Sequence, residues 1–275
     1  MPATVKRLTK QGLASVAFSA GSLLDAAKHE PRAGVYTVGK TYQRTKSLLF
    51  GEHLSRLQES ARQQGFALDC DPTRLRAALR QMILESDYGD VRFRISATAE
   101  PADETRLSIE PFQPPSAQLI ERGARCITSA EVRHNPASKS SEWMHRRRAL
   151  EAAQATGIYE TFLVDAQGKL LEGASSNVYV ILDGALRTAS AGVLAGISRM
   201  IVLAVCESIV PLDPVAPNIA DIDRFSEVFL SSSSRGILPV VELDGMPIGN
   251  GRVGAATLAL RAAYQRWVDD HLEEL

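Results

Sequence analysis

Residues 159–208 alternate short β-rich runs with tight turns and then lead into a helix, and this pattern constrains the fold more than any other. The turn signals Asp165-Ala166-Gln167-Gly168 and Asp183-Gly184 each stand between two β-rich runs. After the second hairpin, the glycine-bearing segment Ala191–Arg199 leads into a helix expected over 197–208. Strands that pair locally and are followed by a helix predict a mixed α+β fold.

The remaining chain shows the same mixture of helical and strand patterns. In the first half, apolar spacing predicts helices over 52–65 and from Asp71-Pro72 onward. Alternation predicts a hairpin between 91–98 and 106–110. The second half has further expected strands at 124–132, 228–231 and 237–243 and helices at 141–156 and 253–272.

A proline-rich segment divides these two halves. The prolines of Glu110–Ser116 cannot continue a helix or a central strand. We therefore expect an interdomain linker near 111–116, a smaller N-terminal α/β domain over 1–115 and a larger domain over 117–275. A cleft between two such domains is the expected place for a ligand site.

Composition excludes several functional classes. The 275 residues are 45% hydrophobic and 23% charged with a net charge of −1, which gives no reason to expect nucleic acid or a membrane surface as partner. Cys70, Cys126 and Cys206 are too few and too scattered for a disulfide framework or a metal site. Without a signal peptide or an apolar run of about 18 residues, the expected location is cytoplasmic.

The residues that could carry chemistry match the needs of pyridoxal 5'-phosphate (PLP). The cofactor needs a lysine for its aldehyde, a carboxylate for its ring nitrogen and hydrogen-bond donors for its phosphate. Lys139, Glu172 and the helix start after Gly192 could supply these groups, with hydroxyls from Ser231–Ser234. Taken singly, each also fits an ordinary surface residue, turn or helix cap.

The order of these pieces resembles the class IV aminotransferases, the PLP fold-type IV group, from about Gly34 to about Gly245. His53-Leu54-Ser55-Arg56-Leu57 is similar to the family's His-x-x-Arg-Leu helix, and Lys139-Ser140 to its lysine segment. Gly157, Glu160 and Glu172–Asn177 follow at nearly the family's spacing. The group includes D-amino acid aminotransferases, branched-chain aminotransferases, R-selective amine transaminases and aminodeoxychorismate lyases.

The resemblance implies a role for each matched residue. Lys139 would form the Schiff base and move the proton during transamination, and Glu172 would keep the ring nitrogen protonated. The remaining implied cofactor contacts, to the ring or the phosphate, are Arg56, Leu194, Gly196, Ile197, Ser198, Ser232 and Ser233. The resemblance also implies a two-domain architecture with the active site between the domains, and a homodimer.

Departures from the family pattern concern the substrate. The family's Gly-Asp-Gly-Val-Phe/Tyr-Glu run reads Pro31–Thr37 here, so that Thr37 replaces a glutamate while Tyr36 keeps an aromatic hydroxyl. The arginine and histidine by which D-amino acid aminotransferases bind a carboxylate are missing from Ser96–Glu100. Candidate replacements, expected to bind substrate together with Tyr36 and Thr37, are Arg32, Arg92 and Arg94; the last two share one face if 91–98 is a strand.

These features favour a PLP-dependent transaminase acting on an amino acid, with a D-amino acid preferred because of Tyr36, and a 2-oxo acid. The lysine aldimine would be the starting form of the enzyme. One alternative is aminodeoxychorismate lyase, which eliminates pyruvate, because Thr37 and Arg133 resemble features of such lyases. A branched-chain L-amino acid aminotransferase is a second possibility within the family, and a non-catalytic PLP-binding or interaction protein is the hypothesis from a different functional class.

Overall fold

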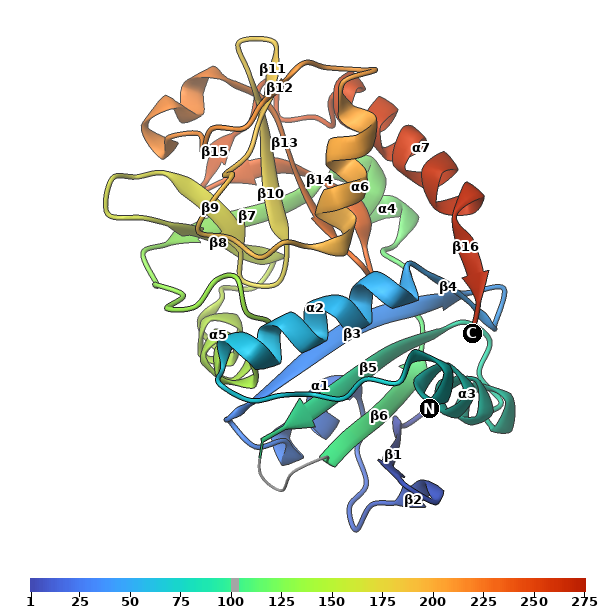
Figure 1. Ribbon diagram of the computed structural model, residues 1–275. Helices are drawn as coiled ribbons and strands as arrows, with labels where there is room; N and C mark the ends of the chain where they lie inside the picture. The colour runs from blue at the N-terminus through green and yellow to red at the C-terminus, as the bar shows by residue number, and fades with distance from the viewer. Residues whose placement is uncertain (100–103) are drawn as a thin grey trace. The chain divides into compact units, whose positions relative to one another are not determined.

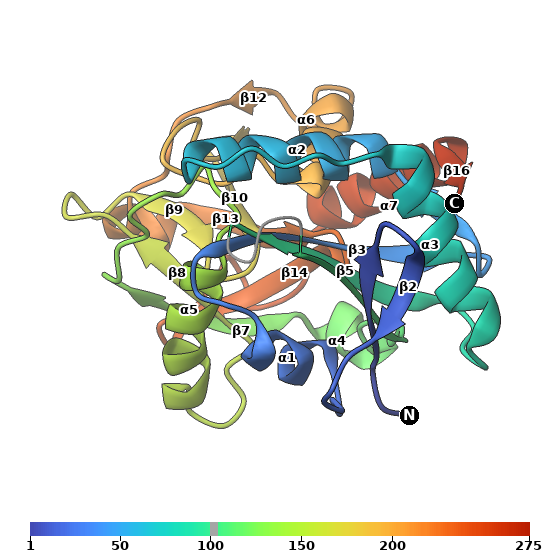
Figure 2. The same ribbon diagram turned by 60° about the horizontal axis from the view of Figure 1, so that its bottom comes forward.

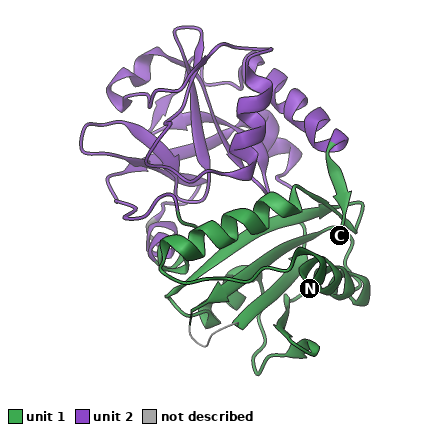
Figure 3. Cartoon of the chain, in the orientation of Figure 1, with its two compact units in different colours: residues 1–113, 138–145, 271–275 green, residues 114–137, 146–270 purple. Residues whose placement is uncertain are grey.

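The computed structural model describes residues 1–99 and 104–275, and its chain divides into two compact units (Figures 1 and 3). Unit 1 consists of Met1–Gln113, Ser138–His145 and His271–Leu275, and unit 2 of Pro114–Ala137 and Arg146–Asp270. The units are therefore not contiguous in sequence, unlike the expected domains 1–115 and 117–275. The segment with Lys139 and the C-terminal residues pack with unit 1.

Unit 1 is built on a 7-stranded sheet in the order β16-β4-β3-β5-β6-β1-β2, in which neighbouring strands are antiparallel. Its strands are β1 Thr4–Thr9, β2 Gly12–Ser15, β3 Gly34–Tyr42, β4 Lys46–Leu48, β5 Val91–Thr98, β6 Glu104–Pro111 and β16 Leu272–Glu274. Its helices are α1 Leu23–Ala26, the 3₁₀ helix Ala27–His29, α2 Phe50–Gln63 and α3 Pro72–Glu85.

The core of unit 1 lies on one face of this sheet. Side chains of α2 and α3, such as Leu57 and Leu79, pack in one buried cluster with Phe93 and Ile95 of β5. Figure 2 shows α2 and α1 on opposite sides of β3 and β5. Residues that alternate with this apolar row on β5 point to the other face, as strand geometry requires.

The predicted elements of this half are largely confirmed. Helix α2 begins at Phe50, slightly before its predicted start, and α3 begins at Pro72, where Asp71 caps it by accepting from the N–H groups of Thr73 and Arg74. The hairpin β5–β6 is present, and it extends to Pro111, which pairs with Val91. A proline is tolerated there because β6 pairs with β1 only up to Ile109, so that Pro111 has a paired strand on one side alone.

Four strands near the N-terminus, β1, β2, β3 and β4, were not predicted. Strand β3 is the most important, because it contains the stretch from Gly34 to Thr37 that the sequence suggested only as a diverged loop. The predicted last helix is also shorter than expected. It ends at Asp270, and Leu272 begins β16, which pairs with β4.

Unit 2 contains a 9-stranded sheet, ordered β12-β11-β10-β13-β14-β7-β8-β9 with β15 beside β14. Strand β9 also pairs with β10, so the strands from β10 to β9 close into a ring around a buried apolar cluster. The strands are β7 Ala124–Ser129, β8 Glu160–Val164, β9 Leu170–Gly173, β10 Asn177–Leu182, β11 Ala185–Arg187, β12 Leu212–Asp213, β13 Phe225–Ser232, β14 Gly236–Leu243 and β15 Met246–Pro247.

The helices of unit 2 pack on the strands. They are α4 Ala117–Arg122, α6 Ile197–Cys206, α7 Ala255–Asp270 and the 3₁₀ helix Ile219–Arg224; helix α5 Ser141–Ala153 starts in unit 1 and ends in unit 2. Helix α6 contacts α7 and β13, and α7 contacts β14. Among the residues described, no helix is long and apolar enough to cross a membrane.

Candidate active site

Lys139 is anchored in unit 1 through its backbone, between β3 and α2. Its carbonyl oxygen accepts a hydrogen bond from the N–H of Tyr36 at 3.0 Å. Its own N–H donates to Oγ of Ser60 at 3.1 Å. The next residue, Ser140, forms a β-bridge with Val35. Although Lys139 lies outside any helix or strand, its backbone is therefore fixed from two sides.

The ring of Tyr36 is close to two cationic side chains. Its centroid lies 5.0 Å from Nζ of Lys139 and 3.6 Å from the guanidinium carbon of Arg94, distances at which a cation is attracted to an aromatic face. Tyr36 is only 3% exposed. Lys139, Tyr36 and Arg94, three of the predicted site residues, are thus neighbours.

The charge of Arg94 is balanced inside unit 1. Nε of Arg94 donates to Oε1 of Glu30 at 2.7 Å, and Nη2 donates to Oε2. Burial acts to lower the pKa of Arg94, but the charge and hydrogen bonds of Glu30 outweigh it and raise the pKa above its usual value. Arg94 is consequently part of a buried bidentate ion pair.

A chain of hydrogen bonds connects Arg56, Thr37 and His53. Nη2 of Arg56 lies 3.0 Å from Oγ1 of Thr37, which lies 2.7 Å from Nδ1 of His53. A guanidinium can only donate, so the hydroxyl of Thr37 accepts from Arg56 and gives its own proton to Nδ1. This assigns His53 as the neutral tautomer with its proton on Nε2. Burial, followed by the charges of Arg56 and Lys139, lowers the pKa of His53 well below its usual value.

The other arginine candidates of unit 1 lie farther out. Arg92 is half-exposed and its Nη2 lies 2.7 Å from Oε1 of Glu110, its cross-strand neighbour on β6. Arg32 is exposed in the segment before β3. Glu100, the last residue of the diverged stretch 96–100, lies outside the residues that the structure describes.

In unit 2, Glu172 is a buried carboxylate with two fixed partners. Its Oε1 accepts from Nη1 of Arg133 at 2.8 Å, and its Oε2 accepts from the N–H of Leu194 at 3.0 Å. Glu172 pairs in register with Asn177 of β10, whose Nδ2 donates to the carbonyl of Leu194 at 2.9 Å. The segment with Leu194 is therefore tied both to Glu172 and to the adjacent strand.

The start of helix α6 provides backbone donors. Gly196 is the N-cap and Ile197 the first helical residue; the first N–H groups of a helix have no partner within it, and its dipole favours an anion there. A Cβ at Gly196 would lie 2.2 Å from Oδ1 of Asn177, so this position requires glycine. Oγ of Ser198 lies 2.9 Å from the hydroxyl oxygen of Tyr264 on α7. Burial raises the pKa of Tyr264 to about 12, against the effect of its hydrogen bond with Ser198.

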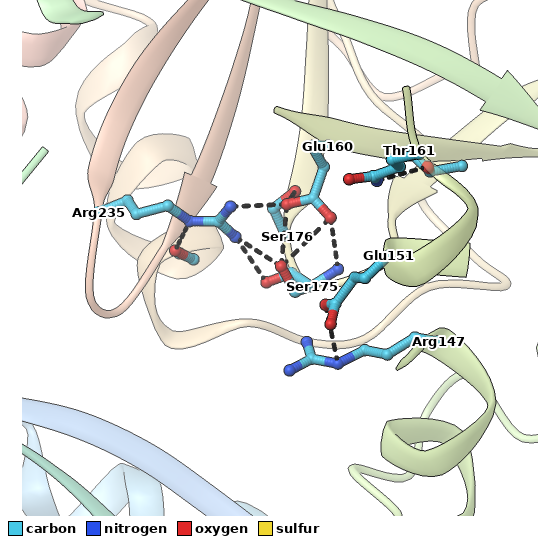
Figure 4. A network of polar contacts seen from close by, with 9 residues as sticks. Arg147, Glu151, Glu160, Thr161, Ser175, Ser176 and Arg235 are labelled. Carbon is cyan, nitrogen blue, oxygen red and sulfur yellow. Dashed lines mark hydrogen bonds and ion pairs between the residues drawn. The ribbon is translucent and has the colours of Figure 1, made fainter. Parts of the chain in front are cut away.

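Two predicted serines lie where β13 ends. Ser232 is its last residue, and Ser233 follows in the turn to β14. Oγ of Ser232 accepts from Nε of Arg235 at 2.7 Å. Arg235 also reaches Glu160 and Ser175, in the network that Figure 4 shows from close by.

The structure thus groups the predicted residues within each unit. Unit 1 brings Lys139 near Tyr36 and Arg94, and it joins Thr37 to Arg56. Unit 2 joins Glu172 to Leu194, at the segment that leads through Gly196 into α6. The two outlying arginines of unit 1 described above are not brought into either group.

Sequence reasoning missed several partners of these residues. Glu30, Ser60, Tyr264 and Arg235 were not singled out, and they contact Arg94, Lys139, Ser198 and Ser232, respectively. Arg235 had a signal, because it directly follows the serine cluster. The others lie far from their partners in sequence, and no local pattern marks them.

The donors present fit PLP. Glu172 is held as a carboxylate by a cation and an N–H group, which suits a protonated ring nitrogen. The start of α6 provides backbone N–H groups, which suit a phosphate. Its N-cap is a glycine at a position with no space for a side chain. Lys139 is a primary amine whose backbone is fixed. Among the described residues, no group of His, Cys, Asp and Glu side chains could hold a metal ion.

Known proteins resemble this chain over most of its length. The family model for amino-transferase class IV matches residues 34–243. A D-alanine aminotransferase of Bacillus licheniformis is 27% identical over 249 residues, 84% of this chain and 86% of the relative. A putative branched-chain-amino-acid aminotransferase of Methanocaldococcus jannaschii is 26% identical over 233 residues, 78% of this chain and 80% of the relative.

Solved structures share the fold. A branched-chain amino acid aminotransferase of T.th. with pyridoxamine 5'-phosphate has a TM-score of 0.84 at 21% identity, covering 100% of this chain and 99% of that one. The branched-chain amino acid aminotransferase of Escherichia coli has a TM-score of 0.80 at 20% identity, covering 98% and 95%. The expected fold-type IV architecture of mixed helices and strands is confirmed.

Proposed function

This chain belongs to the class IV aminotransferases, and from that premise we propose that it transfers an amino group between a D-amino acid and a 2-oxo acid, with Lys139 as the residue that moves the proton. Class IV aminotransferases use PLP. When bound, PLP supplies an aldehyde that condenses with primary amines and a pyridine ring that withdraws electrons from the substrate. The chain's own residues hold the cofactor, orient the substrate and move the proton.

Lys139 is the proposed catalytic residue. Its Nζ would take the proton from the substrate Cα and return a proton on the cofactor side, as a general base and then a general acid. The observation that supports the proposal is the fixed position of Lys139. Its backbone is hydrogen-bonded to Tyr36 and Ser60, and its Nζ lies 5.0 Å from the Tyr36 ring centroid. A lysine held in one place can meet the same atom in each cycle.

Glu172 is the proposed partner of the ring nitrogen. The contacts with Arg133 and with the Leu194 N–H keep its side chain in one orientation. An ionised carboxylate at that nitrogen would keep it protonated. Leu194, in the same segment, would pack against the ring.

The proposed phosphate contacts are those that the family resemblance implies. Arg56 would form an ion pair with the phosphate, in an orientation supported by Thr37 and His53. The backbone N–H groups at Ile197 and Ser198 would donate to the phosphate oxygens. The N–H of Gly196 already donates to the carbonyl of Leu194 at 2.8 Å, so Gly196 would contribute by leaving space for the phosphate. Ser232 and Ser233 would add hydrogen bonds from their side chains or backbone.

The preference for a D-amino acid depends on Tyr36, whose hydroxyl would contact the substrate carboxylate. The D-alanine aminotransferase of Bacillus licheniformis, 27% identical, supports this choice. Arg94 and Arg92 already face Glu30 and Glu110, so each would bind a substrate carboxylate only as part of an ion pair. Arg32 and Thr37 remain further candidates for contacts with the substrate.

The test is the absorption spectrum of the purified protein with PLP, without a keto acid. D-alanine should convert a band at about 410–420 nm into one at about 330 nm, which reports a half-transamination. Lys139→Ala should abolish this conversion of one band into the other, and Tyr36→Phe should weaken it. Conversion by L-leucine alone would instead assign the protein to the branched-chain enzymes, as one relative and several fold neighbours suggest.

Aminodeoxychorismate lyase is the second candidate, favoured by the hydroxyl of Thr37 and by Arg133. Thr37 gives its proton to His53, and Arg133 is bound to Glu172, so both side chains are already close to proposed cofactor contacts. Pyruvate released from aminodeoxychorismate without a keto-acid acceptor would support this lyase. A PLP band that neither amino acid changes would make the lyase the leading function.

Assembly and location follow from the same proposal. We expect a homodimer, which sedimentation equilibrium of the protein with PLP would test; a monomer that is fully active would contradict it. We also expect a cytoplasmic enzyme. Fractionation of the source cells would test this location.

A further inference from the structure

Two segments proposed to contact the cofactor meet at one arginine. The turn that follows Glu172 and Gly173, residues 174–176, connects β9 to β10, and the turn after Ser232 connects β13 to β14. Arg235 lies in the second turn and reaches the first. In Figure 4 its side chain extends to Glu160 and Ser175.

The guanidinium of Arg235 uses all three of its nitrogens. Nη1 donates to Oε2 of Glu160 at 2.6 Å, and Nη2 donates to the carbonyl and Oγ of Ser175 at 3.0 and 2.9 Å. Nε donates to Oγ of Ser232 at 2.7 Å. A salt bridge with Glu160 alone would need only one edge of the planar group, so the Nε contact is a separate connection.

The direction of the contact determines what the serine hydroxyl can do. Nε has one hydrogen and no acceptor capacity, so Oγ of Ser232 must accept. The hydroxyl proton of Ser232 then points away from Arg235 and is available as a donor. Ser175 follows the same rule: it accepts from Arg235 and gives its proton to Glu160, 2.9 Å from Oε2.

A hydroxyl that accepts from a cation is a stronger donor, because hydrogen bonds in a chain polarise one another. An anion such as a phosphate needs donors. The charge of Arg235 is at the same time balanced by Glu160, which is 4% exposed. The network therefore holds a donor hydroxyl in place while adding no net charge of its own.

We propose that Arg235 is a positioning residue for the cofactor phosphate, because it fixes the Ser232 hydroxyl as a donor and ties it to the turn that follows Glu172. The inference rests on the proposed contact between Ser232 and the phosphate. Arg235 itself acts through Ser232, so replacing Arg235 should weaken the binding of the phosphate even when the protein is folded.

The test is a double-mutant cycle with Arg235→Lys and Ser232→Ala. Lysine keeps a cation for Glu160, but one ammonium cannot span Glu160, Ser175 and Ser232 together. Two readouts are used: the dissociation constant of PLP by equilibrium dialysis, and the ³¹P chemical shift of bound PLP. Arg224→Lys is the matched control, an exposed arginine of unit 2 paired with Asp183 and Asp221.

Each single variant should weaken PLP binding by about tenfold, the effect of one hydrogen bond to a charged group, and shift the ³¹P signal. The double variant should bind PLP no more weakly than Ser232→Ala alone, because Arg235 acts through that hydroxyl. Arg224→Lys should change neither readout. Thermal melts without PLP check that the variants are folded.

The outcomes separate this inference from the proposed function. If Ser232→Ala leaves both readouts unchanged, the proposed phosphate contact of Ser232 fails, and the inference fails with it. If Ser232→Ala weakens binding but Arg235→Lys has an equal effect with and without Ser232, only the inference is overturned. Should Arg235→Lys not fold, Arg235→Gln combined with Glu160→Gln replaces the ion pair by neutral amides, and the same cycle applies.

Discussion

Glu160 and Glu172 lie on neighbouring strands of unit 2 and look alike at first sight. They belong to the paired strands β8 and β9, and both are almost fully buried. Each carboxylate meets an arginine, Glu160 at 2.6 Å from Arg235 and Glu172 at 2.8 Å from Arg133. Composition and burial alone would give them the same role.

Their other partners differ. Glu160 accepts from the N–H and the hydroxyl of Ser175 and from the hydroxyl of Ser176, so it organises the turn that follows β9. Glu172 accepts from the N–H of Leu194, in the segment that leads to the start of α6. A buried arginine–glutamate pair therefore does not by itself reveal a functional carboxylate. What distinguishes a functional carboxylate is the segment to which its remaining partners belong.

The strongest test of this difference is Glu172→Gln. The amide can still accept from the Leu194 N–H, but it cannot hold the ring nitrogen's proton, so the rate of half-transamination with D-alanine should fall on the order of 10²–10³-fold. Stopped-flow absorbance with excess PLP measures it. A loss of less than about threefold, which is under 1 kcal/mol of barrier, would remove the proposed distinction between the two carboxylates.

Glu160→Ala should affect folding most. It leaves the guanidinium of Arg235 without its carboxylate in a largely buried network, and breaking such a pair costs about 3 kcal/mol of unfolding free energy. Urea denaturation measures the loss. Glu242→Ala is the control, since its partner Arg125 is 54% exposed and a surface pair contributes at most about 1 kcal/mol. Equal losses would mean that burial does not distinguish the two pairs.

His53 extends the comparison to a buried group of unit 1 that is kept neutral. In the folded protein the pKa of His53 lies well below the usual 6.5. Below about pH 6.5 the unfolded chain therefore binds a proton at this histidine that the folded chain does not bind. Stability should fall with decreasing pH, by up to about 1.4 kcal/mol per pH unit from this group.

Urea midpoints between pH 7.5 and about pH 5.5 measure this slope, and His53→Gln should flatten it. The exposed His134 supplies the control: His134→Gln should keep the slope of the unchanged protein. An unchanged slope in His53→Gln would show that other groups cause the acid sensitivity.

Thr37→Val should have the smallest effect. It removes the hydroxyl between Arg56 and His53 without changing a charge, and one lost buried hydrogen-bond partner costs about 1 kcal/mol of unfolding free energy. Thr37→Ser keeps a hydroxyl and should restore most of that loss. If valine and serine behave alike, the hydrogen-bond chain does not stabilise unit 1.

Local patterns predicted much of the fold. The capping aspartate and proline at 71–72 marked the start of α3, and alternation marked the β5–β6 hairpin. Turn signals of aspartate and glycine marked the hairpins of unit 2. These succeeded because caps, turns and period-two alternation act over a few residues.

Strand β3 and strand β16 were missed for a related reason. β3 is paired with β5, and nearly all of its residues from Gly34 to Thr41 are shielded by the rest of the chain, so it lacks the polar–apolar alternation of a half-exposed strand. β16 is short, and it forms only because β4 offers an edge to the end of the chain. Neither condition can be seen in the segment itself.

By itself, the sequence determined the family, the cofactor and the order of the residues expected to hold it, because these depend on motifs with local spacing. Only the tertiary structure decided which partners those residues have. Arg235 and Glu160 are 75 positions apart, and Arg94 and Glu30 are 64 apart. Such pairs form where folding brings distant charges together out of water, since a buried charge must find a partner wherever the chain supplies one.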